Sequence, residues 1–247
     1  MLRIDRILAN RGYTQRSRVK EYLQSHDVRV ANTRIVRPDT RVPEDDVLID
    51  GTRIDPTTLY ILLNKPVGLV CAHKEEDGNR IVYELFEARW RDRSPPITTV
   101  GRLDKDTSGL LIVTDDGDLV HRLTSPKFHV PRTYVAELQH PLRGDEAAIF
   151  ASGTLMLNRE DNGRPDGDKP LLPGELDVID PTHARLTIRE GRYHQVRRMF
   201  AAVGNHVVAL HRERFGPLTL GDLQPGAQRM LTTEEVDALR TASRAGN

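Results

Sequence analysis

The chain has 247 residues, of which 38% are apolar and 29% charged, and its 36 Lys and Arg balance 36 Asp and Glu. This length and composition predict a soluble globular protein of one or two domains and exclude wholesale disorder. No apolar run approaches the ~20 residues that cross a bilayer, and the charged N-terminal segment lacks the apolar centre of a signal peptide. With Cys71 as the single cysteine, a disulfide framework and a cysteine-based zinc site are excluded, so we expect a cytoplasmic protein.

The zero net charge conceals a segregated distribution. Residues 1–37 hold nine basic and three acidic side chains, and residues 185–214 hold seven Arg and two Glu. Residues 38–57 and 158–180 are acidic, each with a net charge of −4. Clustered basic charge is typical of proteins that bind polyanions, whereas the alternative is a set of ordinary solvated helix faces.

The first 57 residues predict a small, self-contained domain. Apolar spacing predicts helices over residues 3–11 and 15–24, with Gly12 ending the first. Short apolar stretches predict strands near residues 28–30, 35–36 and 47–49. The Pro-containing segment Asp55–Thr58 is the expected linker.

Residues 58–247 predict one larger α+β domain. Apolar runs predict strands over residues 59–63, 69–72, 110–114, 133–138, 176–179, 184–188 and 207–210. Helical spacing predicts helices over residues 82–87, 119–123, 145–152, 193–203 and 233–240. The Gly-, Pro- and Asp-rich residues 158–173 are expected to form a loop.

The densest motif is Gly101-Arg-Leu-Asp-Lys-Asp-Thr-Ser-Gly-Leu110, immediately before a predicted buried strand. Catalytic groups often lie on loops that a rigid strand supports, although a capped turn has the same composition. The residues Asp104, Asp106, Ser108, Gly109 and Asp115 also have the spacing of a calcium-binding loop. Two features oppose that reading: Pro95 and Pro96 precede the motif where a helix is required, and its last position lacks the bidentate Glu.

A second motif, Glu190-Gly-Arg-Tyr-His-Gln-Val-Arg-Arg-Met199, leads into a predicted amphipathic helix. Its apolar face comprises Val196, Met199, Phe200 and Val203. Arg197 lies at the edge of this face, where a partly buried guanidinium needs an anionic partner. Arg198 points to the far side, toward solvent or phosphate; the alternative is an ordinary helix with two surface arginines.

A third motif, Arg132-Thr-Tyr-Val135, lies on a predicted strand where Tyr134, Ala136 and Leu138 share one face. A core tyrosine is the alternative interpretation. The nine histidines show no spacing typical of metal ligands, so we expect them to be satisfied or surface residues and predict no metal site.

In order and spacing, these three motifs resemble those of the RNA pseudouridine synthases, in the family typified by RsuA. The resemblance implies an S4-like RNA-binding domain over residues 1–57 and a mixed-sheet catalytic domain over residues 58–247. It implies the isomerisation of uridine to pseudouridine in rRNA, specifically uridine 516 of 16S rRNA within a small-subunit assembly particle. The reaction needs no cofactor, and the sequence contains neither a GxGxxG motif nor a P-loop.

The resemblance also implies roles for individual residues. Asp104 corresponds to the catalytic aspartate, Arg197 to its ion-pair partner, and Tyr134 to the tyrosine that packs on the uracil. Arg102 corresponds to the arginine that enters the RNA helix where the target base has left. The remaining RNA contacts are expected from the second motif and the N-terminal helices, at Arg192, Gln195, Arg198, Arg16, Arg18 and Lys20.

Several alternatives stay open at the level of sequence. The chain could modify large-subunit rRNA, or act as a non-catalytic assembly factor that binds RNA. Asp104 could attack as a nucleophile or remove a proton as a general base. We expect a monomer, since no apolar stripe for oligomerisation is visible.

Overall fold

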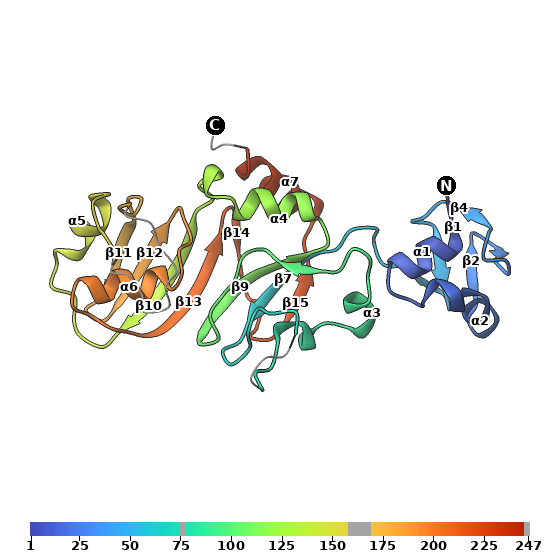
Figure 1. The fold of residues 1–247 in the computed structure, drawn as a ribbon, viewed down its shortest axis with the longest axis horizontal. Coiled ribbons are helices and arrows are strands. Elements are labelled where there is room, and N and C mark those ends of the chain that lie inside the picture. Colours follow the sequence, from blue (N-terminus) through green and yellow to red (C-terminus); the bar gives the residue numbers. More distant parts are fainter. Residues whose placement is uncertain (75–77, 158–168, 245–247) are drawn as a thin grey trace.

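Two regions with separate hydrophobic cores follow one another along the chain in the computed structural model, which describes residues 1–74, 78–157 and 169–244 (Figure 1). The first core is built from side chains between Ile4 and Ile54. The second region has a core on each face of a large sheet, within residues 59–239. The first region lies at one end of an elongated molecule, and β11 with α5 lies at the other (Figure 1).

The N-terminal region contains two short helices and two small sheets. Its helices are α1 (Ile4–Asn10) and α2 (Val19–Ser25), and a 3₁₀ turn at Arg16–Arg18 precedes the second. Its strands are β1 (Leu2–Arg3), β2 (Val28–Val30), β3 (Thr33–Arg34), β4 (Arg41–Val42), β5 (Val47–Ile49) and β6 (Thr52–Arg53). The predicted helices and the strands at 28–30 and 47–49 are confirmed. The strand predicted at residues 35–36 is wrong, because β3 at Thr33–Arg34 pairs with β2, and the pairing of β1 with β4 was not predicted.

The larger region is organised around a mixed sheet with the strand order β11-β12-β10-β13-β9-β7-β15, to which β8 and β14 pair at the side. Its strands are β7 (Tyr60–Lys65), β8 (Thr98–Thr99), β9 (Thr107–Thr114), β10 (Arg132–Leu138), β11 (Glu175–Asp180), β12 (His183–Ile188), β13 (Val207–Phe215), β14 (Leu218–Thr219) and β15 (Gln228–Met230). Only the β9–β13 pairing is parallel among the strand pairs of the described residues. The central strands are enclosed on both faces, which explains the continuous apolar run of β9.

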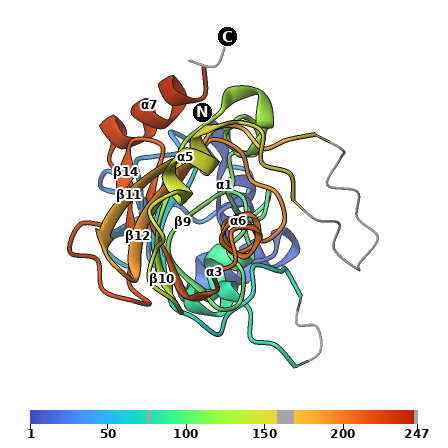
Figure 2. The same cartoon turned by 90° about the vertical axis from the view of Figure 1, so that its left-hand side faces the viewer.

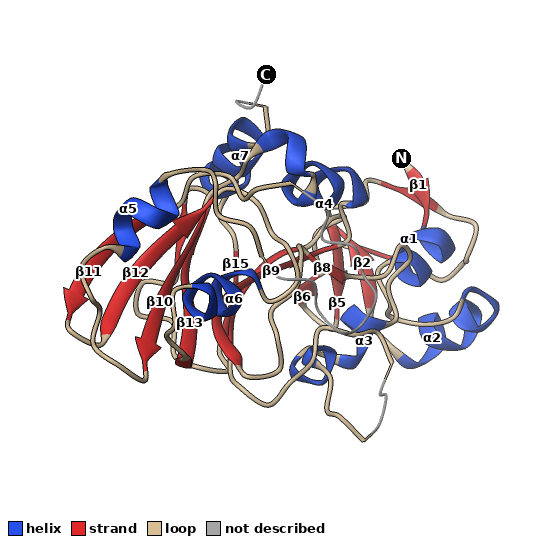
Figure 3. Cartoon of the chain, turned by 60° about the vertical axis from the view of Figure 1, so that its left-hand side comes forward, coloured by secondary structure: helices blue, strands red, loops and turns tan. Residues whose placement is uncertain are grey.

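Helices cover the two faces of this sheet (Figures 2 and 3). Side chains of α5 (Glu146–Ala151) and α6 (Gln195–Ala202) enter the core on one face. Those of α4 (Gly117–Thr124) and α7 (Thr233–Ala242) enter the core on the other. The short α3 (Ala88–Arg91) lies toward the N-terminal region (Figure 1). None of the helices in the described ranges is long and apolar enough to cross a membrane.

Two predicted elements of the larger region differ in the structure. Residues 69–72, predicted as a strand, form only an isolated bridge between Val70 and Ile81. Residues 82–87, predicted as a helix, form a 3₁₀ turn at Val82–Leu85, which Glu84 caps by accepting a hydrogen bond from the Ile81 N–H. Both stretches are too short for a regular element to be stable without strong pairing. Of the predicted loop over residues 158–173, residues 158–168 lie outside the described residues.

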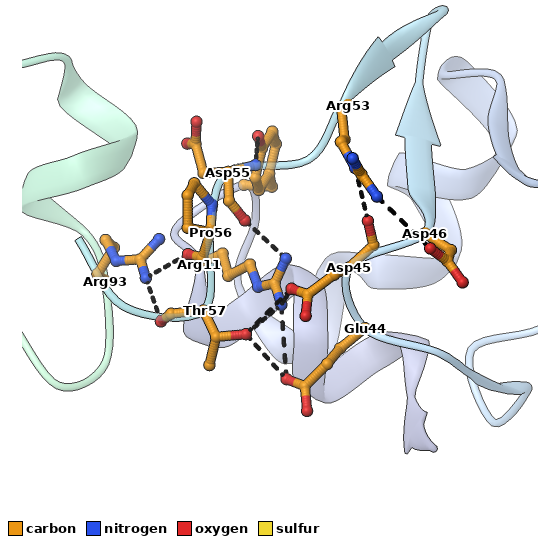
Figure 4. A network of polar contacts seen from close by, with 10 residues as sticks. Arg11, Glu44, Asp45, Asp46, Arg53, Asp55, Pro56, Thr57 and Arg93 are labelled. Carbon is orange, nitrogen blue, oxygen red and sulfur yellow. Dashed lines mark hydrogen bonds and ion pairs between the residues drawn. The ribbon is translucent and has the colours of Figure 1, made fainter. Parts of the chain in front are cut away.

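The linker between the two regions is held from both sides (Figure 4). Arg11 of the N-terminal region donates hydrogen bonds to the Asp55 carbonyl and the Thr57 hydroxyl, both at 2.6 Å. From the other side, Arg93 donates to the carbonyls of Pro56 (3.0 Å) and Thr57 (2.6 Å). The predicted linker is therefore ordered, and its backbone carbonyls accept hydrogen bonds from both regions.

The start of α3 packs directly against the N-terminal region. Arg89 and Trp90 both donate to the Asp55 carboxylate, at 2.7 and 3.0 Å. Burial alone would raise the pKa of Asp55, but these hydrogen bonds and the Arg89 charge hold it below its ordinary value. Gly12 has a φ of +79°, and a Cβ there would lie 1.8 Å from the Arg89 carbonyl oxygen. Only glycine permits this close approach.

Candidate active site

The first motif forms the turn that leads into β9. The backbone conformation or the local packing explains why glycine occupies positions 101 and 109. Gly101 has a φ of +71°, in the left-handed region. Gly109 pairs with Arg212 in the parallel register of β9 and β13, and a Cβ there would lie 2.3 Å from the Arg212 carbonyl oxygen. The close contact between the two strands therefore requires glycine and places the loop before β9 beside β13.

Asp104 lies in this loop with its side chain 31% exposed. Its carboxylate Oδ1 is 3.5 Å from Nε2 of His194. The Asp104 carbonyl accepts hydrogen bonds from the Thr107 N–H and the Lys65 ammonium, both at 3.1 Å. The backbone of the loop is thus fixed while the carboxylate remains accessible to a ligand.

Lys65 is a functional residue that the sequence analysis missed. Its side chain is fully buried at the end of β7, and Nζ donates to the carbonyls of Asp104 and of Thr107 (2.8 Å). Burial lowers the pKa of this ammonium group. The bonds tie β7 to the loop that carries Asp104, so Lys65 positions the loop. The available signal was a lysine immediately after the apolar run of residues 59–63 and Asn64.

Tyr134 lies on β10 and is 8% exposed. As predicted, Tyr134, Ala136 and Leu138 share a buried face. The cross-strand neighbour of Tyr134 on β13 is Arg212, whose guanidinium carbon lies 6.0 Å from the centroid of the Tyr134 ring. Arg212 is therefore a second residue that the sequence analysis missed, because it follows the predicted end of its strand.

The predicted ion pair between Arg197 and Asp104 is wrong for this structure. Nη2 of Arg197 is 2.8 Å from the Asp106 carboxylate, and Nη1 donates to the Val207 carbonyl at 2.9 Å. Asp106 lies two residues further along the same loop and takes the place of Asp104 as the anionic partner. The apolar face predicted for this helix is confirmed, and Arg197 lies at its edge with 19% of its side chain exposed.

His194 occupies the place beside Asp104 that was predicted for Arg197. The residue precedes α6 with a φ of +47°, a left-handed conformation that costs a non-glycine residue ~1–2 kcal/mol. Its ring stacks on Tyr193, with the two centroids 3.8 Å apart. These contacts agree with the expectation of a satisfied or surface histidine, but the position of His194 beside Asp104 was not predicted.

The predicted RNA-binding residues of the second motif have different environments. Arg192 donates to the carbonyls of Lys169 and Pro170 and to the Glu190 carboxylate. Gln195 is 3% exposed, and its carboxamide accepts from the Arg192 N–H and donates to Glu190. We therefore correct the role of Gln195, which holds the turn before α6 and presents no exposed group to RNA.

Arg198 and the N-terminal basic residues are more accessible. Arg198 is partly exposed and donates Nη1 to the Tyr193 carbonyl, rather than pointing freely away from the helix. Arg16, Arg18 and Lys20 are exposed on the N-terminal region. The ion pair of Arg18 with Glu21 (3.3 Å) joins two exposed side chains, where such pairs contribute little stability. The partner of Arg16 is Asp5 (3.4 Å), whose side chain is only 8% exposed.

A cleft of about 840 Å³ brings the three motifs together. Its lining includes Asp104 and Arg102 of the first motif, Tyr134 of β10, and the turn before α6. Of the predicted site residues, the cleft is lined by Arg102, Asp104, Tyr134, Arg192, Gln195 and Arg198, and not by Arg197. A cleft of this size can enclose a nucleotide.

The comparisons with known proteins point to one family. The family model of RNA pseudouridylate synthases matches residues 59–202. Ribosomal small subunit pseudouridine synthase A of Yersinia pestis is 42% identical over 240 residues, which cover 95% of this chain and 97% of that protein. The protein of that name from Escherichia coli K12 is 47% identical over 199 residues, 79% of this chain and 80% of its own.

A crystal structure of a pseudouridylate synthase has the same fold, with a TM-score of 0.66 and 34% identity over 97% of this chain and 100% of that chain. The chain belongs to the RNA pseudouridylate synthase family. It is thus an enzyme, an rRNA isomerase, and the predicted family is confirmed.

A pseudouridine synthase breaks the bond between N1 and C1′ of uridine, turns the base, and joins C5 to C1′. The reaction needs a carboxylate that reaches the sugar or the base, and Asp104 presents one to the cleft. The target base must leave its helix, at a cost of a few kcal/mol, and Tyr134 offers an aromatic side chain on which it can stack.

The calcium-loop interpretation is excluded by the position of β9. The strand occupies residues 107–114, so its two ends lie about 23 Å apart at ~3.3 Å per residue, with Asp104 before one end and Asp115 after the other. Asp115 is instead paired with Arg93 at 2.7 Å. In the residues that the structure describes, no three His, Cys, Asp or Glu side chains are arranged to hold a metal ion.

Replacing Arg102 with alanine is expected to reduce kcat/KM for RNA about tenfold, or ~1.4 kcal/mol, without changing thermal stability. Arg102 is exposed at the cleft and makes no hydrogen bond or ion pair with the described residues, so its charge is available to the RNA. Tritium release from labelled RNA measures the activity, and Arg91→Ala, at an exposed position of α3, is the control. A fall in the melting temperature of R102A would contradict this role.

Proposed function

We propose that this synthase converts uridine 516 of 16S rRNA to pseudouridine, and that its substrate is a small-subunit particle during assembly. The main support is that Asp104 and Tyr134 line the same cleft. The chain that forms this cleft is similar over nearly its whole length to a small-subunit synthase. The finer identification of the uridine rests on that similarity. All three motifs meet within a single chain, so we also propose that the synthase acts as a monomer in the cytoplasm, where ribosomal subunits assemble.

We propose in addition that the N-terminal region is an S4-like RNA-binding domain. Its surface presents Arg16, Arg18 and Lys20 near the start of α2, and residues 1–37 carry three times as many basic as acidic side chains. Such a surface supplies sequence-independent affinity for phosphates, which falls as salt concentration rises. The ordered linker keeps this surface at a fixed distance from the cleft.

The test is to map the modified position. Unmodified 16S rRNA, alone and bound to small-subunit ribosomal proteins, is incubated with the synthase, and pseudouridine is located by chemical labelling and primer extension. We expect a single stop at uridine 516, stronger in the protein-bound particle. Modification at another uridine, or in large-subunit rRNA alone, would overturn the proposed target while leaving the enzyme class intact.

A further inference from the structure

Two arginines that the reaction has not yet used lie together at the cleft. Arg132, on β10, and Arg212, on β13, both line it. Their guanidinium carbons lie 5.3 and 5.2 Å from the centroid of the same ring, Phe215. Two positive charges thus lie beside the same aromatic ring, and Arg212 also lies beside Tyr134.

Arg212 is almost completely enclosed, with 1% of its surface exposed. Its Nε donates to the Leu110 carbonyl at 2.7 Å, while Nη2 is buried without a hydrogen-bond partner. An unpaired donor of a buried cation is costly, so its retention calls for a compensating partner.

Arg132 has no carboxylate partner either among the described residues. Its two terminal nitrogens make only long hydrogen bonds, to the carbonyls of Val130 (3.4 Å) and Leu123 (3.3 Å). Burial, with a further contribution from the positive charge of Arg212, lowers the pKa of Arg132. The pair therefore carries charge that no carboxylate within the described ranges neutralises.

Other enclosed arginines of the described residues have carboxylate partners. Arg93 is paired with Asp115, and Arg11 is paired with Asp45 at 3.1 Å and Glu44 at 3.5 Å. The two carboxylates that line the cleft contact other residues. Asp104 contacts His194, and Glu190 accepts hydrogen bonds from the Leu172 N–H, Arg192 and Gln195.

We infer that Arg132 and Arg212 form a phosphate subsite, which binds a phosphodiester group of the substrate RNA next to the flipped uridine. Phosphate carries the negative charge that the pair lacks, whereas a uracil carbonyl is neutral, and arginine binds phosphate through two parallel hydrogen bonds. Arg132, the more exposed residue, contacts the phosphate. Arg212 supplies the second charge and holds the ring of Tyr134. The inference rests on the proposed function, since it takes RNA as the ligand.

The test compares uridine with its 5′- and 3′-monophosphates as probes, with affinities measured by calorimetry. We expect wild-type protein to bind one of the monophosphates at least tenfold more tightly than uridine. In Arg132→Gln this preference should fall below twofold with the uridine affinity unchanged, and Arg132→Lys should retain part of it. The control is Arg185→Gln, because Arg185 on β12 is already paired with Glu213 on β13, across the intervening strand β10, and does not line the cleft.

Equal affinities of wild-type protein for uridine and both monophosphates would overturn the subsite. An equal loss of affinity for all three probes in R132Q would also overturn it. Inorganic phosphate gives a readout that is independent of activity: it should raise the melting temperature of wild-type protein more than that of R132Q. If this protection depends on Arg132 but no rRNA is modified, the proposed function fails and the subsite stands. If rRNA is modified and protection is equal in both proteins, the subsite fails alone.

Discussion

Replacing Asp104 with asparagine is expected to abolish turnover while leaving RNA affinity within about threefold of wild type. Asparagine has the same shape but can neither attack as an anion nor accept a proton, and loss of such a group costs at least ~10²-fold in rate. The side chain contacts His194 and carries little of the fold, because the loop backbone is held by Lys65. Single-turnover tritium release and filter binding on the same RNA separate the two effects.

Asp106→Asn is the matched control for this prediction. It makes the same chemical change two residues away, at a side chain that is 66% exposed and paired with Arg197. We expect D106N to retain most of the activity, since Asp106 does not line the cleft. Equal loss of activity in both variants would show that the reaction depends on the loop as a whole, or on Arg197, rather than on the Asp104 carboxylate.

The largest loss of stability is expected from Arg93→Met. The ion pair of Arg93 with Asp115 is almost completely enclosed, with side chains 1% and 4% exposed, and Arg93 also holds two linker carbonyls. Its removal leaves a buried carboxylate unpaired, which typically costs ~3–5 kcal/mol. In a chain of this length that lowers the melting temperature by on the order of 10 °C.

Arg37→Met controls for the loss of an arginine from an ion pair. Arg37 pairs with Asp39 at the surface, with side chains 75% and 49% exposed, so its removal is expected to leave the melting temperature nearly unchanged. Thermal unfolding followed by circular dichroism compares the two variants. If R93M loses no more stability than R37M, the enclosed pair is not what secures the linker to the larger region.

Apolar periodicity was enough to predict most of the regular elements. The core side chains Ile4, Ile7 and Leu8 of α1 recur at helical spacing, and the predicted strand 110–114 is the enclosed part of β9. These elements are predictable because burial of their apolar side chains also decides their structure. The same reasoning was wrong for residues 69–72, where an apolar run lacks a partner strand beyond one bridge.

Buried charges limited the prediction of strand ends. The predicted strand 207–210 continues to Phe215, because Arg212 enters the sheet interior and satisfies Nε with the Leu110 carbonyl. Lys65 extends β7 in the same way through the carbonyls of the active-site loop. A prediction from apolar periodicity ends a strand at the first charged side chain. It cannot foresee that the charge is buried, because the hydrogen-bond partner that offsets the burial is distant in the sequence.

The composition of the active site was predictable from its motifs, whereas its internal pairing was not. Asp104 and Tyr134 reach the same cleft as expected. The turn of the backbone between Asp104 and Asp106 determines which of the two carboxylates Arg197 contacts. The left-handed conformation of His194 determines which side chain lies beside Asp104. Such torsions are set by tertiary contacts rather than by local spacing.

The most direct test of the central claim is tritium release from rRNA that contains 5-tritiated uridine. Joining C5 to the ribose expels the hydrogen at C5, so released tritium reports the isomerisation itself. We predict release from small-subunit rRNA, at most one equivalent per molecule, and none from large-subunit rRNA or with D104N. No release from either rRNA, with or without ribosomal proteins, by a protein shown to be folded would contradict the assignment of this cleft as the active site.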